Sequence, residues 1–249
     1  MKTVAFIPAR YGSSRFTGKP LADICGKPMI WWVFQQAKKV AEIDEVFVAT
    51  DDERIKTVCD NLGMNVVMTS TNHSTGTDRV CEAAKYVEAD IVLNIQGDEP
   101  LIEPSVIKEA ITPLLLDNSL SITNLMTAIE SPIDVVNFTV PKVVTNENND
   151  AVYLSRSPIP YPKGSLDYKY FKQVCVYGFR KDALKFFETS KRGKLEEIED
   201  IEILRFIEGN FRVKYVEVKS ESIAVDTKND LKRVIEYLNR NPHLNIILT

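Results

Sequence analysis

Short apolar runs that alternate with stretches of helical periodicity constrain the fold of this chain more than any other feature. The runs at 4–7, 45–50 and 91–95 are bounded by turn or polar residues, which is typical of buried strands. Helical patterns over about 29–42 and 53–62 separate them. This alternation predicts an α/β fold with a doubly wound, mostly parallel sheet. Such sheets bind ligands beyond the carboxyl ends of their strands, so residues directly after the strands are the functional candidates.

The remainder of the chain continues the pattern but changes character in one part. Further strands are expected at 65–69, 121–126, 142–145, 151–155, 172–179 and 213–218, and further helices at 78–87, 104–117, 181–188, 195–208 and 227–239. Prolines at 132, 141, 158, 160 and 162 break the part from 129 to 173. We expect one domain over 1–249, with 129–173 a smaller β-rich excursion that covers the site or forms a dimer interface.

Composition excludes several classes of function. The net charge is −4 and the pI is about 5.4, so no overall basic field is available to hold a nucleic acid. No apolar run approaches the ~20 residues of a membrane span, and no signal-peptide pattern is present. Cys25, Cys59, Cys81 and Cys175 are scattered, so we expect buried free thiols in a reducing cytoplasm.

A basic loop follows the first strand. Arg10, Arg15 and Lys19 share it with Gly12 and Gly18. Glycines let backbone N–H groups approach an anion, and the cations offset its charge, which is what a triphosphate needs. Five residues rather than four separate the two glycines, so this is not a Walker A loop. An ordinary basic surface loop is the alternative.

Three further segments carry candidate side chains. Asp98 follows a glycine just after the strand 91–95, where its carboxylate could bind magnesium. An aspartate that only caps a turn is the alternative. Residues 73–79 follow a predicted strand and place a glycine beside small hydroxyls, although a lone histidine such as His73 is more often structural. Arg156 lies in a rigid proline-rich stretch and is suited to capture a carboxylate, unless it is incidental to a connecting loop.

Residues 7–21 resemble the signature loop of the sugar-acid cytidylyltransferases, and most of all that of the 3-deoxy-manno-octulosonate (Kdo) cytidylyltransferases, the CMP-Kdo synthetase family. Thr17 stands where the family has a proline. The resemblance extends through at least five separated motifs, from Ile7 to about Leu231. It implies a Rossmann-like nucleotidyltransferase that uses Mg²⁺ to couple CTP to Kdo with loss of pyrophosphate. It also implies a homodimer formed through the segment after Ile129, and a product for lipopolysaccharide or surface-polysaccharide assembly.

The resemblance assigns roles to individual residues. The expected catalytic residues are Arg10, Lys19 and Asp98. The expected metal ligands are Asp98 and Asp226, although Asp226 or Thr227 also reads as a helix N-cap. The expected nucleotide-binding residues are Pro8, Ala9, Arg10, Gly12, Ser13, Arg15, Lys19, His73, Thr75, Gly76, Arg79 and Gln96.

The sugar side departs from the family pattern. The expected sugar-binding residues are Gln96, Arg156, Gln173, Tyr177 and Glu202. Gln173 stands where the family has histidine, and Ile203 where it has glutamine. Because a site built to pair a polar group rejects analogues that lack it, the acceptor stays open. An 8-amino analogue of Kdo, a sialic-type acid and a non-catalytic CTP-binding role are the alternatives.

Overall fold

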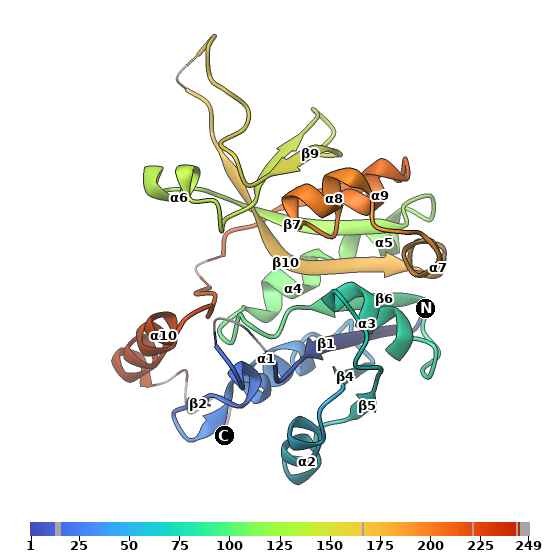
Figure 1. Cartoon of the computed structure of the whole chain (residues 1–249), viewed down its shortest axis with the longest axis vertical. Coiled ribbons are helices and arrows are strands. Elements are labelled where there is room, and N and C mark those ends of the chain that lie inside the picture. Colours follow the sequence, from blue (N-terminus) through green and yellow to red (C-terminus); the bar gives the residue numbers. More distant parts are fainter. Residues whose placement is uncertain (13–15, 166, 221, 243, 245–249) are drawn as a thin grey trace. The chain divides into compact units, whose positions relative to one another are not determined.

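A computed structural model describes residues 1–12, 16–165, 167–220, 222–242 and 244. The chain divides into two compact units, the first formed by Met1–Lys108 with Ser220–Thr249 and the second by Glu109–Lys219 (Figure 1). The expected excursion over 129–173 lies inside the second unit. Its role as a site cover or dimer interface stays a prediction.

The first unit is built on a parallel sheet with β1 (Thr3–Ala9) inside it. On one side β1 pairs with β6 (Ile91–Ile95), and on the other with β4 (Glu45–Thr50), which pairs with β5 (Val66–Met68). Every residue of β1 is buried, as expected for a strand covered on both faces. Helices α1 (Met29–Lys38), α2 (Glu53–Asn61) and α3 (Gly76–Ala83) join these strands, which confirms the doubly wound α/β prediction (Figure 1).

Side-chain caps set where the helices begin. The Asp52 carboxylate accepts the Arg54 backbone N–H at the start of α2. Thr75 and Asp78 form a reciprocal capping box on α3. The helix therefore begins at Gly76, two residues before the expected start at Asp78. Thr227 and Asp230 do the same for α10 (Lys228–Arg240).

A short hairpin in the first unit was not predicted. Strands β2 (Asp23–Ile24) and β3 (Lys27–Pro28) are joined through Cys25 and Gly26, whose φ angles are +51° and +85°. Two consecutive positive φ values are the geometry of a tight hairpin turn. The turn exposes Cys25, so the expectation of a buried thiol is wrong there.

The other cysteines are better covered. Cys59 and Cys81 are buried, whereas Cys175 is partly exposed. Burial raises the pKa of the Cys59 thiol to about 12, so it stays protonated. All four cysteines are free thiols, as expected.

The second unit has a mixed sheet around β7 (Ile122–Ala128). This strand pairs antiparallel with β10 (Phe171–Arg180) and parallel with β11 (Val213–Glu217). The strands β8 (Lys142–Thr145) and β9 (Ala151–Ser155) form an antiparallel hairpin, and β8 also pairs with β10. Helices α6 (Pro132–Val136) and α7 (Lys181–Thr189) precede and follow β10 in the chain.

Two expected helices are each divided. The segment 104–117 forms α4 (Pro104–Glu109) and α5 (Thr112–Leu116), because Pro113 has no N–H to continue the first helix. The segment 195–208 forms α8 (Lys194–Glu199) and α9 (Leu204–Glu208). Asp200 lies between them with φ +51°, a left-handed conformation that ends α8.

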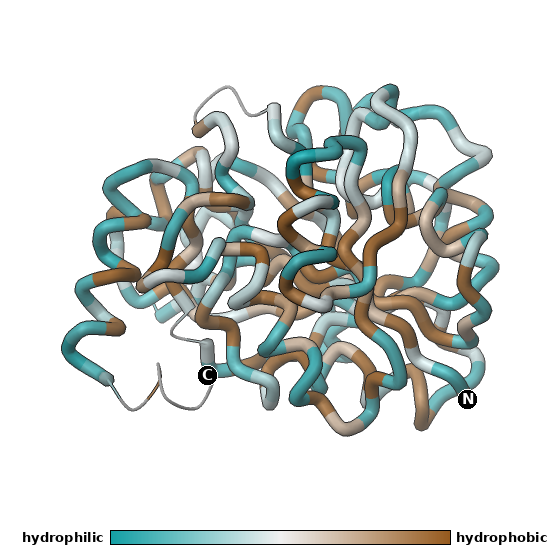
Figure 2. Tube along the Cα trace, turned by 90° about the horizontal axis from the view of Figure 1, so that it is seen from below, coloured by the Kyte–Doolittle hydropathy of each residue, from teal (hydrophilic) through white to brown (hydrophobic). Residues whose placement is uncertain are grey.

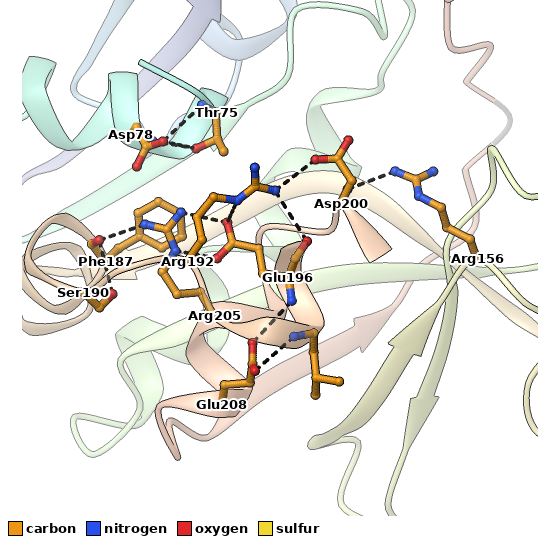
Figure 3. A network of polar contacts seen from close by, with 11 residues as sticks. Thr75, Asp78, Arg156, Phe187, Ser190, Arg192, Glu196, Asp200, Arg205 and Glu208 are labelled. Atoms are coloured by element: carbon orange, nitrogen blue, oxygen red, sulfur yellow. Dashed lines mark hydrogen bonds and ion pairs between the residues drawn. The ribbon is translucent and has the colours of Figure 1, made fainter. Parts of the chain in front are cut away.

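The hydropathy of the chain follows its burial. Figure 2 shows brown hydrophobic stretches, among them the one that follows the N-terminus, separated by teal and white connections. A buried ion pair interrupts the apolar interior of the second unit, where Arg205 makes two hydrogen bonds to Glu196 (Figure 3). Among the described residues, no helix has both the length and the apolarity to cross a bilayer.

Candidate active site

A pocket of about 200 Å³ opens in the first unit, beyond the carboxyl ends of β1 and β6. It is lined by Pro8, Ala9, Arg10, Lys19, Pro20, Gln96, Gly97, Asp98 and Asp226. These residues come from three stretches far apart in the sequence. The edge of the sheet where they meet is the one that a doubly wound fold uses for ligands.

Lys19 is held where it faces the acidic side of this pocket. Gly18, with φ +71°, reverses the chain and donates its N–H to the Tyr11 carbonyl at 2.8 Å. A short 3₁₀ helix, Lys19–Leu21, then begins, with Pro20 buried. The Lys19 ammonium lies 3.3 Å from Asp98 Oδ2 and 3.6 Å from Asp226 Oδ1, and it donates to the Val225 carbonyl at 3.0 Å.

A direct backbone contact joins the two aspartate loops. The Val225 N–H donates to the Asp98 carbonyl at 2.8 Å. The cap of α10 is Thr227, whose hydroxyl accepts the Asp230 N–H, while the Asp226 carboxylate faces Lys19. The alternative of Asp226 as the N-cap is therefore wrong, and its side chain is directed at the pocket.

The donor set of this pocket fits a hard divalent cation. Two carboxylates and one carbonyl converge on a single cationic group, the Lys19 ammonium. Oxygen ligands are the ones that magnesium prefers, and it commonly takes one or two carboxylates with phosphate oxygens and water. No group of three or more His, Cys, Asp or Glu side chains gathers as a metal site within the described ranges. Asp98 and Asp226 would hold such an ion; their assignment stays a prediction.

The start of α3 packs tightly against the strand ends. The Gln96 amide donates to Asn94 Oδ1 at 3.3 Å. A Cβ added to Gly76 would lie 2.7 Å from Gln96 Nε2, so any other residue there would require the Gln96 amide to shift. Thr75 is used in the capping box, and its hydroxyl donates to Asp78 at 2.8 Å.

His73 and Arg79 have partners inside the unit. Arg79 is buried and donates to Asp51 at 3.0 Å and to Thr69 at 2.5 Å, which ties α3 to the ends of β4 and β5. The His73 ring contacts the Glu82 carboxylate. Burial acts to raise the pKa of Glu82, but hydrogen bonds from the Ser70 N–H and His73 outweigh it and lower that pKa.

The predicted nucleotide-binding residues therefore divide into groups. Pro8, Ala9, Arg10, Lys19 and Gln96 line the pocket. His73, Thr75, Gly76 and Arg79 have the contacts above and do not line it, and Gly12 is exposed. Ser13 and Arg15 lie outside the described residues. The nucleotide roles stay predictions.

The predicted sugar-binding residues other than Gln96 lie in the second unit. The Arg156 guanidinium donates to the carbonyls of Glu199, Asp200 and Phe138 at 2.5–3.1 Å, and Figure 3 shows it directed at Asp200. These contacts fix its orientation.

Tyr177 and Gln173 both come from β10. Tyr177 is 6% exposed and stacks on Phe179. Burial, followed by the charges of Cys175 and Glu202, raises the pKa of Tyr177 well above its ordinary value. Gln173 is half-buried, with its amide directed at Asn124. The sugar roles of Arg156, Gln173, Tyr177 and Glu202 stay predictions.

Several site residues were missed from the sequence. Pro20 and Gly97 line the pocket, and the Val225 carbonyl accepts from Lys19. A backbone carbonyl has no signature in the sequence. Asn94 did leave one, because it is a polar residue inside an otherwise apolar strand. Asn124 left none, because it lies among the threonines of β7.

This chain is similar to known proteins over nearly its full length. The family model described as cytidylyltransferase matches residues 4–223. The 3-deoxy-manno-octulosonate cytidylyltransferase of Geobacter metallireducens is 45% identical, and the match covers 96% of this chain and 99% of that protein. The solved structure of a CMP:2-keto-3-deoxy-manno-octonic acid synthetase complexed with CTP is 40% identical with a TM-score of 0.92, covering 97% of this chain and 100% of that one.

A more distant structure shares the fold alone. The 4-diphosphocytidyl-2C-methyl-D-erythritol synthase of Anaerococcus prevotii has a TM-score of 0.64 at 15% identity, covering 96% of this chain and 99% of that one. The sequence match over nearly the full length is much stronger evidence than this likeness. The chain belongs to the cytidylyltransferase family and, within it, to the 3-deoxy-manno-octulosonate cytidylyltransferases.

Proposed function

We propose that this protein transfers a cytidylyl group from CTP to the anomeric hydroxyl of Kdo, giving CMP-Kdo and pyrophosphate. One observation carries the proposal: Lys19, Asp98 and Asp226 meet in one pocket at the carboxyl ends of β1 and β6. The relatives named as Kdo cytidylyltransferases, at 41–45% identity, support the same activity.

The reaction is an in-line displacement at the α-phosphorus of CTP. Proteins assist such a step mainly by positioning the reactants and neutralising charge. Arg10 and Lys19 would bind the triphosphate and offset the charge that develops on the leaving pyrophosphate. Magnesium bound to Asp98 and Asp226 would supply further charge neutralisation.

The natural acceptor is the finer part of the proposal. Kdo is the acceptor that the names of the relatives favour. Gln173 leaves an amino analogue of Kdo as a second candidate, because an amide carbonyl accepts a hydrogen bond from an ammonium group. A sialic-type acid has no observation of this structure in its favour.

The proposal extends to location and assembly. CTP is an intracellular nucleotide and all four cysteines are free thiols, which supports a cytoplasmic enzyme. Exposed apolar side chains on and after α6 support a homodimer.

Pyrophosphate release with Mg²⁺, CTP and a panel of acids tests the proposal. The panel contains Kdo, its 8-amino analogue and a nine-carbon sialic acid. Turnover of Kdo or the amino analogue, lost when EDTA removes the metal, is the expected result. Tight CTP binding without turnover of any acid would favour a CTP sensor, and preferred turnover of the sialic acid would replace the proposed substrate.

A further inference from the structure

The amide of Gln173 is held in one orientation by a buried polar network in the second unit. Its Nε2 group lies 2.7 Å from Asn124 Oδ1 and 3.4 Å from the Tyr215 hydroxyl. Asn124 and Tyr215 are both fully buried, whereas Gln173 is half-buried at the edge of the network. Three strands contribute, namely β7, β10 and β11.

An irregularity in β10 fixes the Asn124 amide. The pairing of β10 with β7 shifts register between Val174 and Tyr177. The Asn124 Nδ2 group donates there to the carbonyls of Val174 and Val176, at 3.0 and 2.8 Å. Carbonyl oxygens only accept hydrogen bonds, so the opposite orientation of Asn124 would set oxygen against oxygen. Asn124 Oδ1 must therefore face Gln173 as an acceptor.

This constraint passes on to Gln173. The group that faces the Asn124 oxygen has to be a donor, so it is the Gln173 NH₂. Burial raises the pKa of Tyr215 well above its ordinary value, which keeps the phenol neutral as the second partner. Both N–H bonds of Gln173 are thereby used, and its carbonyl oxygen Oε1 makes no hydrogen bond to a described residue.

We infer that Asn124 and Tyr215 are positioning residues, which hold Gln173 so that its Oε1 atom can only accept a hydrogen bond. The sugar site would therefore select a sugar acid that carries a hydrogen-bond donor, either a hydroxyl or an ammonium group, at the position facing Oε1. The inference rests on the proposed function, because it takes Gln173 to contact the sugar. A histidine at this position can donate or accept according to its tautomer, whereas this amide can only accept.

The test compares acceptors that differ in one substituent. Kdo is assayed beside analogues in which one hydroxyl at a time becomes amino, methoxy or fluoro. In the wild type, the methoxy and fluoro analogues at one position should lose about tenfold or more in kcat/KM, while the amino analogue is retained. The loss should appear mainly in KM, because the contact is made away from the reacting phosphorus.

Two variants separate positioning from structure. Gln173→Met, near in shape but without an acceptor, should abolish the discrimination among substituents. Tyr215→Phe should reduce the difference in kcat/KM among the substituents without abolishing it. Tyr168→Phe changes an exposed tyrosine of the same unit and should leave that difference unchanged. Gln173→His should shift preference from the amino analogue towards Kdo.

The outcomes distinguish the inference from the function beneath it. If the wild type turns over none of these acids, the proposed function fails. If it turns over Kdo but Gln173→Met keeps the wild-type ratios, the inference is wrong and the function stands. An equal fall in kcat for every acceptor in both variants, with a lowered thermal midpoint, would assign the network to folding and would also overturn the inference.

Discussion

Lys19 makes the contacts that a bound cation would make in this pocket. Its ammonium touches Asp98, Asp226 and the Val225 carbonyl at once. An amide in place of the Asp98 carboxylate would keep the shape and lose the negative charge that attracts a metal ion. We therefore expect Asp98→Asn to lower kcat by about 100-fold or more, measured as pyrophosphate release.

Stability provides the control for this variant. Asp98 is 30% exposed, so its pairing with Lys19 contributes little to the free energy of unfolding. The thermal midpoint of Asp98→Asn should stay near that of the wild type. Addition of Mg²⁺ and CTP should raise the midpoint of the variant by less than it raises that of the wild type. Asp167→Asn, on an exposed loop, is the matched charge change. Near-normal turnover by Asp98→Asn would remove Asp98 from the metal site.

Gly18 is the residue whose conformation places Lys19. Its φ of +71° is strained for a residue with a Cβ, and an added Cβ would lie 3.2 Å from the Tyr11 ring. We expect Gly18→Ala to cost about 1 kcal/mol in the free energy of unfolding and to reduce activity as well. Gly63, with φ +65° and open space around it, is the control. Gly63→Ala should lose similar stability and keep its turnover; equal activity in both variants would contradict this role of Gly18.

At the scale of elements, the junction of α8 and α9 depends on a buried ion pair. Glu196 is fully buried and Arg205 is 5% exposed, with two hydrogen bonds of 2.6 and 2.7 Å between them (Figure 3). Removing one partner leaves a buried charge uncompensated, so Glu196→Gln should lower the free energy of unfolding by about 3 kcal/mol. Chemical denaturation measures this change.

A double variant and a surface pair complete that experiment. Glu196→Leu combined with Arg205→Met should cost less than either single change, because both buried charges are removed and Arg192, the other partner of Glu196, keeps its pair with Asp200. Arg212→Met removes a half-exposed arginine that pairs with Asp150 and Asp117, and it should cost about 1 kcal/mol or less. If Glu196→Gln lowered the free energy of unfolding by no more than Arg212→Met does, the buried pair would not be what stabilises these two helices.

Glu199, the last residue of α8, gives this region a pH dependence. Burial acts to raise its pKa, but hydrogen bonds from the Arg156 N–H, Ser155 and Tyr153 outweigh it and lower the pKa. A carboxylate with a lowered folded-state pKa contributes stability above its unfolded pKa of about 4.3, and this is lost as the pH falls through the folded value. The stability difference between wild type and Glu199→Gln should thus be constant from pH 8 to about 5 and shrink below about 4.3.

Denaturation at a series of pH values measures this difference. Glu197→Gln, an exposed carboxylate on the same helix, controls for the change in net charge. A difference that grows as the pH falls would contradict the contacts assigned to Glu199.

The elements show what local sequence could predict. The strands β4, β6, β8 and β9 have the expected bounds, because an apolar run between turn residues marks both ends of a strand. The single helix over 195–208 was wrong because hydrophobic periodicity continues across the break at Asp200. Periodicity reports which face is buried, and it carries no signal for one residue that turns left-handed.

At the scale of the whole molecule, family motifs predicted which remote residues lie together better than local patterns did. Lys19, Asp98 and Asp226 were expected to converge although they are remote in sequence, and the structure brings them together. The role of Asn124 was beyond reach, because it depends on the register of β10 against β7. The partners of Arg79 likewise depend on where β4 and β5 end relative to α3.

The α6 patch, consisting of Ile133, Val136 and Phe138, carries the prediction about assembly. These side chains are 75%, 69% and 71% exposed, which is costly for apolar groups in water. A second copy of the chain would cover them in the proposed homodimer.

A charge there would be buried without a partner, so Ile133→Asp with Phe138→Asp should shift the mass in light scattering from that of a dimer to the 28.2 kDa of one chain. Leu116→Asp, on an apolar residue of the same unit that is 82% exposed, should leave the dimer intact. Because the pocket around Lys19 belongs to the first unit, the monomeric variant should keep its thermal shift with Mg²⁺ and CTP, which separates loss of the dimer from misfolding. A wild-type monomer, or a double variant that remains dimeric, would remove the α6 patch from the interface.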